Sequence, residues 1–185
     1  MLKIVFENEA FVIVDKPGGT LSVPSQWGVE DPRPVLSIML QEQLRCRLWP
    51  VHRLDFDVSG LLVFAKSEGP HRAANKWFEA REIHKVYEAW GVGEPPSIKS
   101  GEIVEWNSML HRGKKRTFET PHGKLAVTRA SWLKQLPASE VKIQQWALDP
   151  LTGRPHQLRV EMAKHGNPIL GDFLYGGENI FLERL

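Results

Sequence analysis

Four segments in the second half of the chain have the composition of β-strands, with no helical pattern between them. They are HKVYEAWGV (84–92), GEIVEW (101–106), LAVTRASWL (125–133) and VKIQQWAL (141–148), and all are rich in β-branched and aromatic residues. Strands that follow one another without intervening helices favour an antiparallel sheet over a regular parallel βαβ array. The chain is therefore predicted to be built around antiparallel strands.

The first half of the chain mixes short strands with helices. Residues 4–6 and 11–14 have strand composition and are followed by the turn residues 17–19, Pro-Gly-Gly, which predicts an opening hairpin. Apolar residues recur at three- and four-residue steps over residues 34–47, as they do in an amphipathic helix. Residues 60–65, GLLVFA, predict a buried strand. A second helix is expected at residues 71–81, with these side chains facing inward: Ala74, Trp77 and Phe78.

Two further segments complete the predicted fold. Residues 111–124, HRGKKRTFETPHGK, predict a long hairpin tip. Residues 152–168 predict a helix with Pro155 in its first turn and Gly166 in the left-handed position after its last. Core or sheet-face positions are expected for these tryptophans: Trp27, Trp77, Trp90, Trp106, Trp132 and Trp146. The expected class is α+β, with a mostly antiparallel mixed β-sheet and flanking helices.

Composition narrows the class of protein. A chain of 185 residues with 42% hydrophobic and 25% charged residues fits a single soluble domain, residues 1–185, for which we expect a monomer. No apolar run reaches the roughly 20 residues that cross a bilayer. The N-terminus carries acidic residues where an export signal is apolar, so we expect a cytoplasmic protein without a membrane partner.

Cysteine and histidine content limits the possible chemistry. The single cysteine, Cys46, excludes an intrachain disulfide and a Cys-rich zinc site, and we expect it to be a buried thiol on a helix. The histidines lack the H-E-x-x-H spacing, so no metal site is expected.

The formal charge of the chain, +2, is only weakly basic. Any nucleic-acid site must therefore come from local clustering of charge.

Three segments place polar residues where a protein commonly mounts reactive groups: HRLDFDVSG (52–60), KVYEAWGVG (85–93) and TGRPHQLRVEMAKHGNPILGDFLYGG (152–177). Each has an ordinary structural explanation by itself. Asp55 could cap a turn, Tyr87 could fill the core, and Arg154 could be a solvated side chain. Arg154 precedes a proline, which favours extended backbone and a strand-to-helix corner from which the side chain can enter a cleft.

In order and content these segments resemble the RluA-type family of pseudouridine synthases. HRLDFDVSG is similar to the family's His-Arg-Leu-Asp motif followed by Ser-Gly, and KVYEAWGVG to its Lys-x-Tyr motif with a downstream Gly. GRPHQLR followed by GNPILGDFLYGG (166–177) is similar to its C-terminal motif. FVIVDKPGGTLSVP (11–24) and GKLAVTRA (123–130) agree more weakly. The resemblance implies the pseudouridine synthase catalytic fold with a central RNA-binding cleft.

The resemblance also implies the reaction and its residues. A uridine in transfer or ribosomal RNA would be isomerised to pseudouridine, with Asp55 as nucleophile at the anomeric carbon or as the base that removes a 2′ proton. Both routes stay open, and only the family alignment selects Asp55 over Asp57. A buried aspartate must be kept ionised by a cation, for which Arg154 is the first candidate and Arg159 the second. Tyr87 would stack on the uracil and assist removal of the C5 proton, with no cofactor or metal.

The expected partner is a structured RNA stem-loop, bound by cationic side chains. Arg53 could fill the space left by the flipped base or grip the backbone, and a structural salt bridge is an equal alternative. The clearest basic cluster is the run at residues 112–116. The residues expected to contact RNA are His52, Arg53, Lys85, Arg159, Arg112, Lys114, Lys115 and Arg116.

The sequence departs from the family pattern in two places and leaves two other functions to consider. Val58 stands where the family usually has threonine, and the N-terminal RNA-binding domain of larger members is not expected here. A hydrolase using His52, Asp55 and Ser59 is disfavoured because the three crowd one turn and no G-x-S-x-G elbow is present. The alternative retained is a catalytically silent RNA-binding or RNA-folding module of the same fold.

Replacing the basic run by alanine tests its role. A variant with alanine at all four cationic positions, Arg112, Lys114, Lys115 and Arg116, should bind RNA more weakly. It makes fewer phosphate contacts and therefore releases fewer counterions when it binds. The dissociation constant measured across a salt series should therefore depend less steeply on salt. Binding that matches the wild type at every salt concentration would show that the run is only solvated surface.

Overall fold

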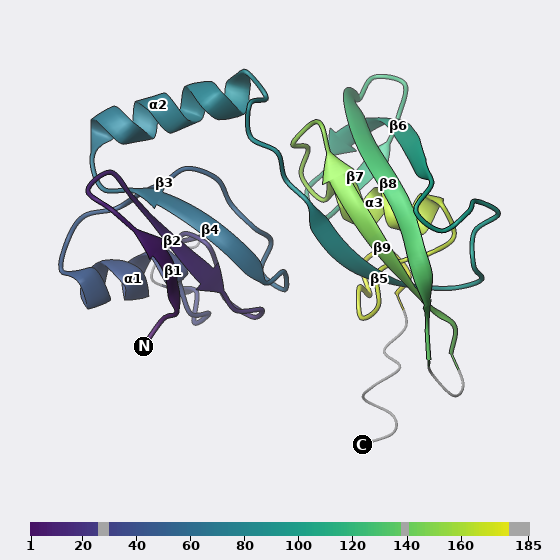
Figure 1. Ribbon diagram of the computed structural model, residues 1–185, viewed down its shortest axis with the longest axis horizontal. Coiled ribbons are helices and arrows are strands. Elements are labelled where there is room, and N and C mark those ends of the chain that lie inside the picture. Colours follow the sequence, from purple (N-terminus) through teal and green to yellow (C-terminus); the bar gives the residue numbers. More distant parts are fainter. Residues whose placement is uncertain (26–29, 138–140, 178–185) are drawn as a thin grey trace. The chain divides into compact units, whose positions relative to one another are not determined.

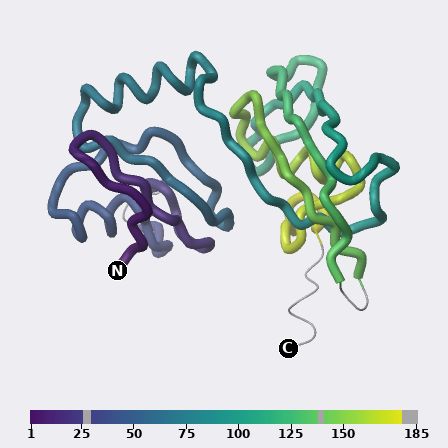
Figure 2. Tube along the Cα trace, viewed as in Figure 1, coloured from purple at the N-terminus to yellow at the C-terminus, as the bar shows by residue number. Residues whose placement is uncertain are grey.

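The computed structural model describes residues 1–25, 30–137 and 141–177, so Trp27 lies outside the described residues. It divides into two compact units, Met1–Ile83 and His84–Leu185, each with its own sheet (Figures 1 and 2). The single catalytic domain expected from the sequence stays a prediction. None of the described helices has the length and apolar character needed to cross a membrane.

The described part of the first unit contains an antiparallel sheet in the order β1-β2-β4-β3. Its strands are β1 (Ile4–Glu7), β2 (Phe11–Lys16), β3 (Trp49–Pro50) and β4 (Gly60–Ala65). The register of β2 against β4 runs from Phe11 opposite Ala65 to Lys16 opposite Gly60. The end of β2 therefore lies beside the polar segment that leads into β4.

Two helices pack on this sheet. Helix α1 (Leu36–Leu44) buries Leu36 and Leu40 in a core with Val12, Val14, Leu62 and Phe64. Helix α2 (Glu68–Glu79) packs along β3 and β4, and its Trp77 contacts Phe11, which alternates with the core-facing Val12. Helix α2 therefore packs on the face of the sheet opposite to the face that α1 covers.

Two predictions for these helices are wrong. Cys46 is exposed and not helical, because α1 ends at Leu44 and Arg45 turns the chain with a φ of 52°. Trp77 is 40% exposed. Of this helix only Ala74 is fully buried, and the larger rings remain partly in solvent.

The described residues of the second unit form an antiparallel sheet in the order β5-β9-β8-β6-β7. Its strands are β5 (Tyr87–Val92), β6 (Ile103–Arg112), β7 (Thr117–Glu119), β8 (Lys124–Leu136) and β9 (Ile143–Pro150). Helix α3 (Gln157–Lys164) packs against β6, β7, β8 and β9. Trp106, Trp146 and Met162 form much of the core between this helix and the sheet. Together the units confirm an α+β fold.

The predicted hairpin tip is more ordered than expected. Residues 117–119 form strand β7, which pairs with the end of β6 from Arg112 opposite Thr117 to Leu110 opposite Glu119. Arg112 of the basic run therefore ends β6, and the other three cations lie in the tight turn of residues 113–116, where Gly113 N–H donates to Arg116 O at 2.9 Å.

The ends of α3 confirm one sequence prediction and correct another. Gly166 follows the helix with a φ of 75°, as expected. Pro155, in contrast, lies in a turn before the helix, because His156 adopts a left-handed φ of 54° and the helix begins only at Gln157.

Helix α3 also buries an acid. The Glu161 side chain is 0% exposed, and among the described residues neither carboxylate oxygen has a hydrogen-bond partner. Burial raises the pKa of this carboxyl, and nearby Ser108 and Lys164 only partly oppose the effect. Burial also lowers the pKa of the adjacent His165. The core therefore favours a neutral Glu161.

Glu161→Gln should change how stability depends on pH. A folded-state pKa above the ordinary 4.5 contributes stability below the unfolded pKa that is lost as pH rises through the folded pKa. The free energy of unfolding of the wild type should thus fall relative to the Gln variant as the pH rises above the ordinary pKa of 4.5. Urea unfolding at several pH values measures this difference.

Glu119→Gln is the matched control, because the pKa of Glu119 is shifted in the opposite direction to that of Glu161. The Lys164 ammonium lowers the pKa of the exposed Glu119 carboxyl, so its contribution is lost as pH falls. A difference between wild type and Glu161→Gln that stays constant with pH would contradict a protonated Glu161.

Candidate active site

Residues 52–59 form a turn between β3 and β4 that carries the predicted acid. Asp55 is half-buried, whereas Asp57 and Arg53 are exposed. Val58 N–H donates to Asp55 O at 3.2 Å, which closes the turn. Sequence could not distinguish the two aspartates, but their burial differs.

A buried lysine fixes this turn from β2. The Lys16 side chain is 0% exposed, and its Nζ donates to the carbonyl oxygens of Pro17 (3.0 Å), Thr20 (2.7 Å) and Phe56 (3.1 Å). Burial lowers the pKa of this ammonium, while the charges of Asp57 and Asp55 oppose that change. Lys16 thus connects residues 17–20 to the residue that follows Asp55.

Residues 18–22 hold the same turn by other contacts. Ser22 Oγ donates to Leu54 O at 2.8 Å and accepts from Leu54 N–H at 3.0 Å. Gly18 lies so close that an added Cβ would be 2.9 Å from Asp57 O. The weakly matching segment FVIVDKPGGTLSVP therefore has a structural role: it supports the backbone on both sides of Asp55.

His52 is held as part of the scaffold. Its ring stacks on Phe78 of α2 with centroids 5.3 Å apart, and its Nε2 accepts from Val63 N–H at 3.3 Å. A ring nitrogen that accepts a backbone N–H is not available to deprotonate Ser59, which further disfavours the hydrolase. Its predicted RNA contact stays a prediction.

The other candidates belong to the second unit. Tyr87 begins β5 and packs, partly buried, against the core cluster that Leu158 of α3 also contacts. Lys85, just before it, is partly buried, and burial lowers the pKa of its ammonium while Asp149 opposes this. Arg154 lies in the turn before α3, where its Nε donates to Leu125 O at 3.0 Å.

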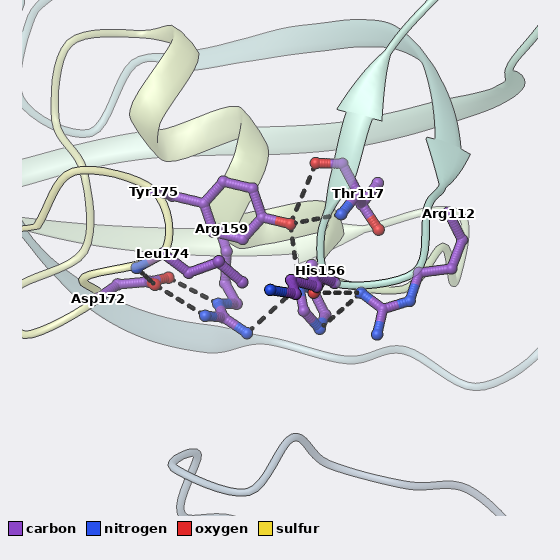
Figure 3. Close-up of polar contacts among 8 residues, drawn as sticks. Arg112, Thr117, His156, Arg159, Asp172, Leu174 and Tyr175 are labelled. Carbon is purple, nitrogen blue, oxygen red and sulfur yellow. Dashed lines mark hydrogen bonds and ion pairs between the residues drawn. The ribbon is translucent and has the colours of Figure 1, made fainter.

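Arg159 is the most firmly held of the predicted arginines (Figure 3). Its Nε and Nη2 donate to the two carboxylate oxygens of Asp172 at 2.6 and 2.7 Å. Its Cζ lies 5.1 Å from the centre of the Tyr175 ring. The side chains of Arg159 and Asp172 are 20% and 7% exposed, so the guanidinium is fixed in a largely buried place.

Sequence reasoning missed three residues of this group. His156, Asp172 and Tyr175 connect Arg159 to the basic turn, with His156 between Arg159 and Arg112 (Figure 3). The signal was present, since all three lie in the quoted motifs GRPHQLR and GNPILGDFLYGG. Among the described residues, no group of His, Cys, Asp or Glu side chains is arranged to hold a metal ion.

Comparison with known proteins identifies the family. Residues 10–164 match the family described as RNA pseudouridylate synthase. The dual-specificity RNA pseudouridine synthase RluA of Vibrio vulnificus (strain CMCP6) is 38% identical, over 99% of this chain and 73% of that protein. The enzyme of the same name from Escherichia coli (strain K12) is 33% identical, over 94% and 77%.

The fold agrees with this assignment. The solved structure of human RNA Pseudouridylate Synthase Domain Containing 1 matches 100% of this chain and 74% of that one with a TM-score of 0.79 and 25% identity. The chain therefore belongs to the RNA pseudouridylate synthase family, and the family predicted from the motifs is confirmed.

Lys16→Met should loosen the turn that carries Asp55. It removes a buried donor from one carbonyl in the turn and two in the segment 17–20, so the free energy of unfolding should fall by about 2–4 kcal/mol. Equilibrium urea unfolding measures the loss. Lys3→Met, which removes only an exposed ion pair with Asp15, should change it by about 0.5 kcal/mol or less. Equal losses in both variants would contradict the role of Lys16.

Proposed function

We propose that this chain isomerises a uridine in a transfer or ribosomal RNA stem-loop to pseudouridine. The N-glycosidic bond breaks, the uracil rotates while bound, and C5 bonds to the ribose. The observation that supports this most strongly is the half-buried Asp55 on a turn fixed by the buried Lys16, in a chain that belongs to the pseudouridylate synthase family. The relatives named dual-specificity RNA pseudouridine synthases support the RNA class.

Asp55 is the proposed reacting carboxylate. It acts either as the nucleophile at the anomeric carbon or as the base that takes the 2′ proton. Both routes need an ionised carboxylate at a fixed position, since a misplacement of about 1 Å can cost a hundredfold in rate. The contacts of Lys16 and Ser22 on either side of Asp55 supply this rigidity.

A cation from the second unit keeps the carboxylate ionised in this proposal. Sequence favours Arg154, with Arg159 second. The contacts within the second unit support Arg159 instead, because Asp172 and the Tyr175 ring fix its guanidinium in a largely buried place. Arg154 commits its Nε to the backbone of Leu125. We therefore assign the counter-charge to Arg159 and a backbone-supporting role to Arg154.

Tyr87 and the cationic side chains complete the proposal. Extruding a uridine costs a few kcal/mol, and stacking it on Tyr87 returns roughly 1–3 kcal/mol. Affinity must therefore come largely from phosphate contacts, which we assign to Arg53 and the basic turn 112–116. The two units are proposed to work as one catalytic domain, in a cytoplasmic monomer without a cofactor.

Asp55→Asn should abolish the reaction while RNA binding survives. Because the amide can neither attack nor accept a proton, the rate of pseudouridine formation should fall at least about a hundredfold. Incubation with total RNA from a strain lacking the protein, followed by chemical mapping of pseudouridine, measures this. Asp57→Asn is the matched control and should keep most of the activity. A wild type that modifies no uridine would instead support the silent RNA-binding module.

The same assay separates the arginines. Arg159→Ala should approach the loss seen with Asp55→Asn, whereas Arg154→Ala should keep measurable activity. The reverse order would return the counter-charge to Arg154.

A further inference from the structure

His156 lies between two arginines that come from different elements (Figure 3). On one side, Arg112 at the end of β6 places its Nη1 3.3 Å from His156 Nε2. On the other side, Arg159 of α3 places its Nη1 3.4 Å from His156 Nδ1. The first arginine belongs to the basic turn and the second is the proposed counter-charge of Asp55.

The hydrogen bonds define the state of the His156 ring. A guanidinium can only donate, so in the neutral tautomer in which Nε2 accepts from Arg112 the ring proton lies on Nδ1. Nδ1 then donates to Tyr175 Oη at 2.9 Å. Tyr175 Oη also accepts from Thr117 N–H at 2.7 Å and donates to Thr117 O at 3.1 Å. In this tautomer Arg159 Nη1 lies beside Nδ1 as a close contact and donates no hydrogen bond to it.

The backbone of His156 is also unusual. Its φ of 54° lies in the left-handed region, which is uncommon for residues other than glycine. Sparsely populated backbone conformations persist where surrounding contacts hold them, and they concentrate at functional sites. Here the ring is held by contacts from β6 and from the segment after α3, which carries Tyr175.

The basic turn is attached to the same group by its backbone. Tyr175 Oη bonds both the N–H and the carbonyl of Thr117, the first residue of β7 after the turn. Arg112, the last residue of β6 before the turn, bonds His156 and also Lys115 O at 3.5 Å. Both ends of the turn are thereby fixed to the residues around Arg159.

We propose that His156 is a positioning residue that joins the RNA-binding turn to Arg159 through a neutral imidazole held by Tyr175. Phosphate binding at the turn and the orientation of the proposed catalytic guanidinium then depend on one set of contacts. The part of this inference that concerns catalysis, the orientation of Arg159 by His156, rests on the proposed function. The part that concerns binding, the dependence of Arg112 on His156, does not require the proposed function.

The test is a double-mutant cycle on RNA binding and on catalysis. Arg112→Ala, His156→Asn and the double variant are compared for the dissociation constant of an RNA stem-loop across a salt series and for kcat and KM. Asparagine accepts the left-handed backbone but is too short to replace the ring. His156→Asn should weaken binding, reduce its salt dependence, and lower kcat by about tenfold to a hundredfold. Arg112→Ala should then have little further effect on binding.

Matched variants separate positioning from folding. His122→Asn, the same change at an exposed histidine in the loop between β7 and β8, should leave binding and kcat unchanged. Tyr175→Phe keeps the ring beside Arg159 and removes only the hydroxyl, so it should reproduce the effects of His156→Asn. If His156→Asn does not fold, Tyr175→Phe can replace it in the double-mutant cycle with Arg112→Ala.

The outcomes are distinguishable. Fully additive effects of Arg112→Ala and His156→Asn on binding would overturn the inference. A wild type that binds RNA but forms no pseudouridine would overturn the proposed function, while the binding cycle would still decide whether His156 positions Arg112.

Discussion

The candidate site depends first on a buried ammonium group. Taking the Lys16 charge out of water costs several kcal/mol unless hydrogen bonds replace the lost hydration. Carbonyl oxygens on two separate segments supply them, so the lysine stays buried only while those segments hold their positions. Because the Lys16 charge is costly to bury without these hydrogen bonds, the backbone beside Asp55 must keep the position that supplies them. Ser22 and Gly18 act in the same direction, the first by bonding Leu54 and the second by its close approach to Asp57.

In the second unit, contacts with neighbouring side chains likewise fix the orientation of a cation, Arg159. Arg159 is fixed on one edge by Asp172 and lies over the ring of Tyr175, whose hydroxyl in turn holds the start of β7. One tyrosine thus contributes a ring face to the arginine and a polar group to the backbone. In both units, rigidity comes from side-chain contacts with a neighbouring segment: Lys16 bonds main-chain carbonyls, whereas Asp172 bonds the Arg159 side chain.

Much of this could be predicted from the sequence, for identifiable reasons. Strands were found where β-branched and aromatic residues cluster, and the family was found because its motifs keep fixed residue spacing. The predictions failed where burial depends on neighbours distant in the chain. Trp77 has an apolar side chain on a helix and contacts Phe11, but 40% of it stays exposed. The end of α1 before Cys46 has no glycine to signal it, because Arg45 adopts the left-handed conformation itself. The roles of Lys16 and His156 rest on contacts that periodicity does not encode.

The placement of the basic turn has a consequence for how such enzymes diversify. The residues that fasten it, Arg112 and Thr117, are the strand ends on either side, and residues 113–116 between them form only the tip. Insertions or charge changes within the tip could therefore accumulate between related species while the fastening pairs stay intact. In the proposed function, where the tip contacts RNA, preference for one RNA over another could then change independently of the isomerisation chemistry.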